Sequence, residues 1–326
     1  MAGATGSRTT PDPHVRVDRR GVALCLVSAV GFGCMAIFAK DAYKQDLGIT
    51  SLLALRFALA ALIFWAIARL RGPIAFPPRR VLLAAFGLGA VGYAAQSGLF
   101  FGAVKRMDAS TTALLLYTYP AIVFIAALAL RREHADRRKL AALALACAGT
   151  ALVLVGGGGS GSFESVGVVM ALAAAIAYST YILVADTVVS KIDPFLLSAM
   201  IATGAATTFW LTGLVHGGLT VSLSAHGWLD IAGIVIVSTV LPVITFLLGL
   251  DLVGAATASI VSCFEPVVTV SLAMLLYGER LGPAQLAGGA LVLSAVILLQ
   301  AKVRGDGAPA ETTRPAPARA LARDLA

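Results

Sequence analysis

The stretch Val166–Val184, VGVVMALAAAIAYSTYILV, decides the fold class, because it carries no charged residue over 19 positions. A helix rises about 1.5 Å per residue, so a segment of this length crosses most of the ~30 Å hydrocarbon core of a bilayer. The stretch shows no alternation of apolar and polar side chains, as a strand of a membrane barrel would. It therefore predicts a membrane-spanning α-helix.

Blocks of the same kind recur along the whole chain. Of its 326 residues, 59% are hydrophobic and only 13% are charged, and the mean hydropathy is +0.89. Soluble domains carry about 25% charged residues, so water cannot be the main solvent. We expect an all-α integral membrane protein with ten transmembrane helices. The expected spans are residues 21–39, 51–70, 81–103, 109–130, 139–155, 166–184, 194–214, 228–248, 255–276 and 284–300.

The two halves of the sequence align on each other at one offset of 146 residues. This offset places Pro120 on Pro266 and Glu133 on Glu279. Each half holds an odd number of expected helices, so the second half enters the membrane in the opposite sense, as two inverted five-helix repeats. The expected divisions are a disordered cytoplasmic tail (1–20), a first repeat (21–155), a Gly/Ser linker (156–165), a second repeat (166–303) and a disordered cytoplasmic tail (304–326).

The basic residues indicate how the chain is oriented. With the N-terminus in the cytoplasm, 19 of the 25 Lys and Arg residues fall on the cytoplasmic side and five on the other. Membrane proteins carry such an excess in their cytoplasmic loops. We therefore expect a multi-pass protein of the cell membrane, of the bacterial inner-membrane type, with both termini cytoplasmic. Orientation explains the net charge of +8 without a nucleic-acid partner.

The sequence shows no pattern of an enzyme or of a metal site. Its four histidines are scattered through a tail and loops, and its four cysteines fall inside apolar blocks without CxxC spacing. It has no P-loop, no Ser/His/Asp order and no dinucleotide-binding glycine motif before a helix. We expect no catalytic residue, no metal and no cofactor.

Four short motifs resemble the EamA-type members of the drug/metabolite transporter superfamily. They are Leu55-Arg56-Phe57, Tyr119-Pro120, Phe264-Glu265-Pro266-Val267-Val268 and Gly278-Glu279-Arg280-Leu281. The resemblance covers roughly residues 20–303 and implies a basket of helices around a central cavity, with the fifth and tenth helices set to one side. It also implies alternating access to metabolites that are usually exported.

Glu265 and Arg56 are charged residues inside expected spans. Glu265 lies near the bilayer midplane, where an ionised carboxylate is costly unless it faces a cavity, is protonated or pairs with a cation. It is interpreted either as a site for a coupled proton or a substrate ammonium group, or as a hydrogen bond that fixes a bend. Arg56 either snorkels to the surface or pairs with an acid such as Asp230, or it binds a substrate carboxylate.

Prolines and polar side chains in apolar spans complete the candidate site. Pro120 and Pro266 occupy equivalent positions inside expected helices, where proline removes a backbone hydrogen bond; they act as paired hinges or as static kinks. Aromatic and amide side chains suit the lining of a cavity for an organic solute, although each also suits helix packing. The candidate cavity residues, besides Glu265 and Arg56, are Tyr93, Gln96, Ser97, Tyr117, Thr118, Tyr119, Tyr178 and Tyr181.

Other residues have structural interpretations. Asp108 is expected to cap the helix that follows it, and Glu133 and Glu279 to form ion pairs in loops. Small residues favour close packing of helices, or a dimer face, so we expect a monomer or a homodimer. These residues are Gly87, Gly89, Gly92, Gly98, Ala144 and Ala148.

Together these features predict a secondary transporter that exports a small organic metabolite by alternating access, with possible proton coupling through Glu265. Without an ATP-binding motif, the energy must come from a gradient. The alternative is a flippase for lipids or isoprenoid lipids on the same fold. A membrane-embedded lipid enzyme is less favoured because no span holds two acids within reach, and a passive channel would show rings of pore-lining residues.

Overall fold

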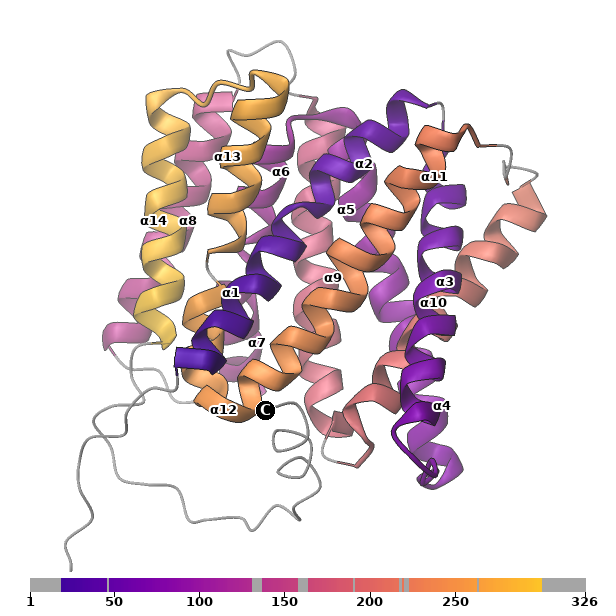
Figure 1. The fold of residues 1–326 in the computed structure, drawn as a ribbon. Helices are drawn as coiled ribbons and strands as arrows, with labels where there is room; N and C mark the ends of the chain where they lie inside the picture. Colours follow the sequence, from indigo (N-terminus) through magenta and orange to yellow (C-terminus); the bar gives the residue numbers. More distant parts are fainter. Residues whose placement is uncertain are drawn as a thin grey trace, which may run out of the picture.

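The chain folds as a bundle of helices (Figure 1). The computed structural model describes residues 19–45, 47–130, 137–157, 164–189, 191–216, 219, 223–262 and 264–300. Every regular element within these residues is helical, so the all-α expectation is confirmed for this part of the chain. Residues 1–18 and 304–326 of the expected tails, residues 158–163 of the expected linker and Glu133 lie outside it. Arg19 and Arg20, expected in the tail, instead begin a helix (Arg19–Gly33), and Gly156 and Gly157, expected in the linker, end another (Arg137–Gly157).

The helices follow one another with short connections. The first half holds α1 (Arg19–Gly33), α2 (Met35–Lys44), α3 (Ile49–Leu70), α4 (Arg79–Gly87), the π-helical segment η1 (Leu88–Tyr93), α5 (Ala94–Arg106), α6 (Ala109–Leu116), α7 (Tyr119–Ala129) and α8 (Arg137–Gly157). The second half holds α9 (Ser165–Val189), α10 (Pro194–His216), α11 (Ala225–Ala232), the π-helical segment η2 (Gly233–Val240), α12 (Leu241–Ser262), α13 (Glu265–Tyr277) and α14 (Pro283–Gln300).

Six helical stretches among the described residues are long and apolar enough to cross a membrane. They are Arg19–Lys44, Ile49–Leu70, Arg79–Arg106, Ser165–Val189, Pro194–His216 and Ala225–Leu250. Four shorter apolar helices accompany them, within α6–α7, α8, α13 and α14. The start of α1 and the end of α14 lie at the same end of the bundle (Figure 1). The count of ten spans and their inverted order stay predictions.

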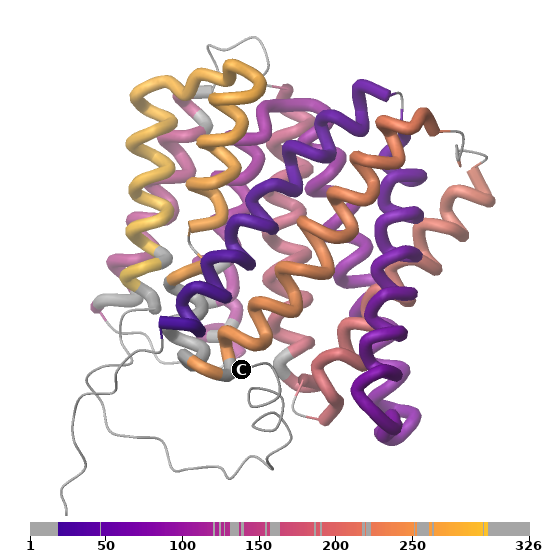
Figure 2. The backbone as a smooth tube through the Cα atoms, viewed as in Figure 1, coloured from indigo at the N-terminus to yellow at the C-terminus, as the bar shows by residue number. Residues whose placement is uncertain are grey.

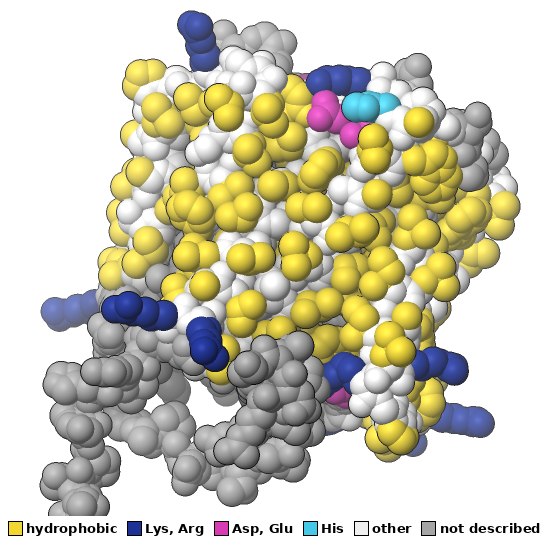
Figure 3. Space-filling model, in the orientation of Figure 1, with side chains coloured by type: hydrophobic (Ala, Val, Ile, Leu, Met, Phe, Trp, Pro, Cys, Tyr) yellow, Lys and Arg dark blue, Asp and Glu magenta, His cyan; other side chains and the backbone are white. Residues whose placement is uncertain are grey.

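The outer surface of the bundle is apolar. Figure 3 shows hydrophobic side chains spread over the face in view, with charged groups gathered toward its two ends. Large side chains stand out from this wall, including Leu62, Val91 and Leu275, which is 79% exposed. An apolar surface this extensive would be a liability in water. It is the surface that a protein surrounded by lipid requires.

Three expected spans are interrupted rather than continuous. The first breaks at Cys34 between α1 and α2, the span at 109–130 breaks between α6 and α7, and the span at 255–276 breaks between α12 and α13. Pro120 and Pro266, expected inside helices, instead occupy the first turn of α7 and α13. The physical reason is that a first-turn N–H has no partner within its helix, so proline loses no hydrogen bond there.

Hydroxyl groups from other helices donate to the carbonyls at these interruptions. Thr269 Oγ1 donates to Gly33 O at the α1–α2 break (2.9 Å). The Tyr117 hydroxyl lies 3.1 Å from Ser262 O. In a continuous helix this carbonyl would accept from the N–H of the residue four positions later, but that residue is Pro266, which has no N–H. Because hydrocarbon offers no hydrogen bonds, an irregular turn within a bilayer must find its donors inside the protein.

Two oblique helical paths lie side by side across the bundle. Figure 2 shows the α1–α2 path next to the α11–η2–α12 path. At their contact, a Cβ added to Gly31 would stand 2.5 Å from both Pro242 Cγ and Val237 O. The Ser28 hydroxyl donates to Pro242 O across the same contact (2.8 Å). The first and second halves of the chain are therefore packed backbone to backbone.

Helices α8 and α14 form an edge of the bundle (Figure 1), as the family resemblance implied. Their backbones almost touch, since a Cβ on Gly149 would lie 2.6 Å from Gly288 O. Ala142 is buried in this contact. Ala144 and Ala148, expected to allow close helix packing or to form a dimer face, are exposed in the single chain. At 3.6 residues per turn they lie on another face of α8 than Ala142 and Gly149, so the packing within the chain does not use them.

Glycine also sets the approach of η1 to α10. A methyl group on Gly89 would collide with the carbonyl of Ile201 in α10. Gly87, expected to have the same role, has no atom within 4 Å of an added Cβ, so that expectation was wrong. The two glycines are one half-turn apart on the same helical path, and only one of them faces a neighbouring backbone.

We predict that Gly89→Ala destabilises the protein and that Gly87→Ala does not. Overpacking against a backbone atom costs about 1–3 kcal/mol, whereas replacing an unobstructed helical glycine by alanine gains about 0.5–1 kcal/mol. Thermal unfolding of the purified variants in detergent measures both. Equal melting temperatures for the two variants would show that η1 and α10 are not in backbone contact.

Candidate functional site

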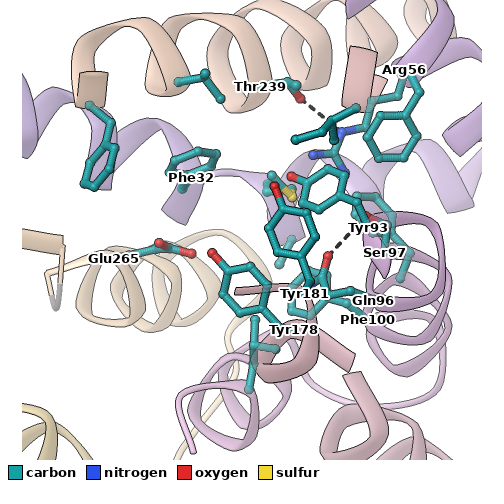
Figure 4. Close-up of a pocket in the computed structure, with 18 of the residues that line it drawn as sticks. Phe32, Arg56, Tyr93, Gln96, Ser97, Phe100, Tyr178, Tyr181, Thr239 and Glu265 are labelled. Atoms are coloured by element: carbon teal, nitrogen blue, oxygen red, sulfur yellow. Dashed lines mark hydrogen bonds between the residues drawn. The ribbon is translucent and has the colours of Figure 1, made fainter. Parts of the chain in front are cut away.

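A cavity of about 380 Å³ lies between the helices of both halves (Figure 4). Small-molecule sites have volumes of about 300–1,000 Å³. Its walls come from α1, α2, α3, η1, α5, α6, α7, α9, α10, η2, α12 and α13. Nine of the ten candidate residues line it: Arg56, Tyr93, Gln96, Ser97, Tyr117, Tyr119, Tyr178, Tyr181 and Glu265.

Thr118 is the candidate that the structure places apart from this lining. Its side chain is buried, and its hydroxyl donates to Leu115 O within the turn between α6 and α7 (2.8 Å). The expected cavity position is therefore wrong for Thr118. The hydroxyl instead bonds a backbone carbonyl beside the α6–α7 break, a common arrangement for threonine in membrane helices.

Glu265 and Tyr117 meet where two interrupted helices face each other. Tyr117 follows the last residue of α6, and Glu265 is the first residue of α13. The tyrosine hydroxyl lies 2.9 Å from Glu265 Oε2 and 3.1 Å from Ser262 O. Glu265 faces the cavity, one of the arrangements expected for a carboxylate at this depth.

Arg56 is fully buried in α3 and lines the cavity. The alternative that it snorkels to the surface was therefore wrong, because η2 covers this side of α3. Its Nε donates to Thr239 Oγ1 in η2 (3.0 Å), and that hydroxyl donates to Ile234 O (2.8 Å). Within the described residues Arg56 forms no salt bridge, so the expected pairing with Asp230 is not observed.

Five tyrosines form a row of ring contacts along the cavity. Their centroids lie 5.4 Å apart for Tyr93–Tyr181, 6.0 Å for Tyr181–Tyr178, 4.7 Å for Tyr178–Tyr119 and 5.8 Å for Tyr119–Tyr117. The row begins with Tyr93, which lies next to Arg56, and it ends with Tyr117, which bonds to Glu265. Figure 4 shows Tyr93, Tyr181 and Tyr178 between the two charged side chains.

Gln96 and Ser97 supply amide and hydroxyl groups near Tyr93. Both side chains are buried, and the Ser97 hydroxyl donates to Gln96 Oε1 (3.2 Å). The bond occupies one acceptor position of the amide, so other donor and acceptor positions of Gln96 remain for a solute. The cavity thus combines flat aromatic walls with a few polar groups.

Thr239 is the important cavity residue that sequence reasoning missed. The signal was present, because the offset of 146 residues that relates the two halves places Thr239 on Tyr93, a candidate. Phe57, Phe100 and Phe101 also line the cavity. Nothing in their sequence context separates them from ordinary packing residues, since phenylalanine suits both roles.

Glu279 joins the two halves of the chain at one end of the bundle. Its carboxylate pairs with Lys40 of α2 (2.9 Å) and accepts hydrogen bonds from Ala109 N, Ser110 N and Ser110 Oγ at the start of α6 (3.1, 3.2 and 2.7 Å). The expected ion pair is thus present. Asp108, expected to cap α6, occupies the N-cap position, but the capping oxygens belong to Glu279.

The pKa of Glu279 reflects these partners. Burial alone would raise it, but the hydrogen bonds from Lys40 and Ser110 and the charge of Lys40 outweigh burial, so the pKa lies below the ordinary value of 4.5. A carboxyl whose pKa is lowered by folding stabilises the folded state at pH values above its ordinary pKa. That stabilisation is lost as the pH falls through the lowered pKa.

Comparison with known proteins finds transporters. The EamA-like transporter family model matches residues 19–155 and, separately, residues 165–300. The uncharacterized transporter YcbK of Bacillus subtilis is 28% identical over 290 residues, which cover 86% of this chain and 93% of the relative. An uncharacterized transporter of Archaeoglobus fulgidus is 25% identical over 287 residues, 87% of this chain and 97% of the relative. These names indicate transporters rather than enzymes.

A solved structure supports the fold alone. It is described as the crystal structure of a protein, and it aligns with a TM-score of 0.61 at 18% sequence identity. The alignment covers 86% of this chain and 96% of the other. The helical arrangement is therefore shared with an experimentally determined structure.

We predict that Glu279→Gln lowers stability by about 1–3 kcal/mol at pH 7, the range for hydrogen bonds to a buried charged group. Since the stabilisation by the carboxylate disappears below its lowered pKa, the difference from wild type should shrink as the pH falls below 4.5. Thermal unfolding in detergent over a pH series measures this difference.

The matched control is Asp41→Asn, which removes a partly exposed carboxylate that pairs with Lys44 at 2.8 Å and lies beside Tyr277. Exposed pairs contribute about 0–1 kcal/mol, so this variant should melt close to wild type at every pH. A destabilisation by Glu279→Gln that does not change with pH would contradict the role given to its charge.

Proposed function

The chain belongs to the EamA-like transporter family, and on that premise we propose that it is a secondary transporter that exports a small organic metabolite. It is a multi-pass membrane protein with apolar membrane-length helices. The single observation that carries the proposal is the cavity between the two halves, with Glu265 inside it. A cavity that contains a carboxylate within a lipid-surrounded bundle marks a solute or ion pathway.

The proposed architecture is ten spans in two inverted five-helix repeats. In its support, the offset of 146 residues places η1, at residues 88–93, on residues 234–239, which lie inside η2. It also places the α6–α7 break on the α12–α13 break. Transport then follows from rocking of one repeat against the other, with Pro120 and Pro266 as paired hinges. Both termini are cytoplasmic and the membrane is the cell membrane.

Proton coupling is proposed to act through the single proton of the Tyr117 hydroxyl. When Glu265 is ionised, the hydroxyl donates to the carboxylate rather than to Ser262 O. When Glu265 is protonated, the carboxyl group donates to the tyrosine oxygen, and the hydroxyl donates to Ser262 O. Both acceptors lie within hydrogen-bonding distance, at 2.9 and 3.1 Å. Protonation would thereby change the bonding of the turn between α12 and α13.

The test is transport in proteoliposomes with and without a pH gradient. A thermal-shift screen of the purified protein against a metabolite library first selects the solute, because a ligand of the folded state raises the melting temperature. We predict that the gradient accelerates wild-type transport of that solute. Glu265→Gln should lose this acceleration while it keeps gradient-independent exchange.

Glu164→Gln is the charge-loss control, because Glu164 is an exposed residue near Arg106 and lies outside the cavity. It should respond to the gradient as wild type does. Identical transport rates in all conditions for wild type and Glu265→Gln would rule out the coupling role. An absence of transport for every solute that the screen selects would contradict the proposed function itself.

A further inference from the structure

Arg56 carries buried guanidinium donors at the wall of the cavity. Its Nε is held by Thr239, but neither Nη1 nor Nη2 has a hydrogen-bond partner in the structure, and both atoms are buried. The guanidinium carbon lies 4.7 Å from the ring centroid of Phe57 and 5.2 Å from that of Phe101. The side chain is therefore fixed on one edge and flanked by aromatic rings, and its outer fork is buried beside Tyr93 at the cavity wall.

A buried guanidinium without a counterion is costly. Arginine stays protonated in proteins, and an unpaired charge in a low-dielectric interior costs several kcal/mol. Glu265 lies in the same cavity but bonds to Tyr117, and the Asp230 carboxylate is not bonded to the guanidinium. No carboxylate in the described part of the chain pairs with Arg56, so an anion that reaches the guanidinium beside Tyr93 would neutralise a charge that the protein leaves unpaired.

The remainder of the cavity limits what that molecule can be. The tyrosine row offers flat, mostly apolar faces that extend from Arg56 toward Glu265, and a volume of about 380 Å³ suits a small organic molecule. A planar fork of N–H donors matches the two oxygens of a carboxylate. An inorganic anion would leave the aromatic walls unused.

We infer that Arg56 is an oxyanion subsite: its two Nη groups bind the carboxylate of an organic solute whose apolar body lies along the tyrosine row. The inference rests on the proposed function, because it names the substrate class of that transporter as small organic carboxylates. Thr239 is a positioning residue in this arrangement, since it holds the Nε edge of the guanidinium.

The test is equilibrium binding to the purified full-length protein in detergent, measured by calorimetry and by thermal shift. The probes are phenylacetate and octanoate, each with its neutral amide, phenylacetamide and octanamide. Wild type should bind at least one acid about tenfold or more tightly than its amide, because charge-assisted bidentate bonds are lost with the neutral head group. Acids that bind no better than their amides would overturn the inference, as would sulfate that binds as tightly as either acid.

Three variants test whether Arg56 causes the preference for acids over amides. Arg56→Gln should abolish the difference between acid and amide, and Arg56→Lys should keep part of it, because an ammonium group carries the charge without the planar fork. Thr239→Val leaves the guanidinium in place and should weaken acid binding several-fold without changing amide binding. This variant decides the question if Arg56→Gln fails to fold.

The control is Thr245→Val, on the same helical path, whose hydroxyl bonds to Leu241 O and which does not line the cavity. Thr245→Val should bind the acids and their amides as tightly as wild type does. Loss of acid binding in Thr245→Val equal to that in Thr239→Val would overturn the positioning role. Binding is measured without transport, so the two proposals can fail separately. If the protein prefers acids to amides but transports no solute, the proposed function is contradicted and the subsite is not. If it transports solutes but does not prefer acids, the subsite is contradicted and the proposed function is not.

Discussion

The structure depends on one constraint: the surrounding hydrocarbon supplies no hydrogen bonds, so the backbone polar groups within the bilayer must be satisfied inside the protein. The interrupted helices meet this constraint with hydroxyl groups from the other half of the chain. Thr269 of α13 bonds the carbonyl at the α1–α2 break, and Tyr117 at the α6–α7 break reaches the last carbonyl of α12. The hydrogen bonds that satisfy the irregular turns are therefore also contacts between the two halves of the chain.

The same constraint explains where the cavity lies. Helix interruptions are tolerated at membrane depth only where they are packed in protein or face a cavity, and the breaks that carry Tyr117 and Glu265 face the same space. Arg56 enters this space from α3 and is positioned by the π-helical segment η2. The Nη groups of Arg56 are buried beside this space without a hydrogen-bond partner, and they are the groups that we propose to bind a solute.

The sequence was sufficient for the features set by composition and period. Hydropathy predicted an all-helical protein, in which six described helical stretches are long and apolar enough to cross a membrane. Nine of the polar side chains singled out in apolar spans line the cavity. It was not sufficient where a neighbour from distant sequence decides the outcome. Arg56 is buried because η2 covers it, and α6 is capped by Glu279 from the other half rather than by the adjacent Asp108. A proline also predicts an interruption but not the residue where the helix stops.

The most direct test of the account is the side of the membrane on which equivalent residues lie. Gln45 and Lys191 are exposed and related by the offset of 146 residues. Single-cysteine variants at these positions, made after replacing the four native cysteines, would be treated in intact cells with a membrane-impermeant maleimide. Two inverted repeats predict that Gln45→Cys is labelled in intact cells and Lys191→Cys only after permeabilisation. Labelling of both from the same side would contradict the account.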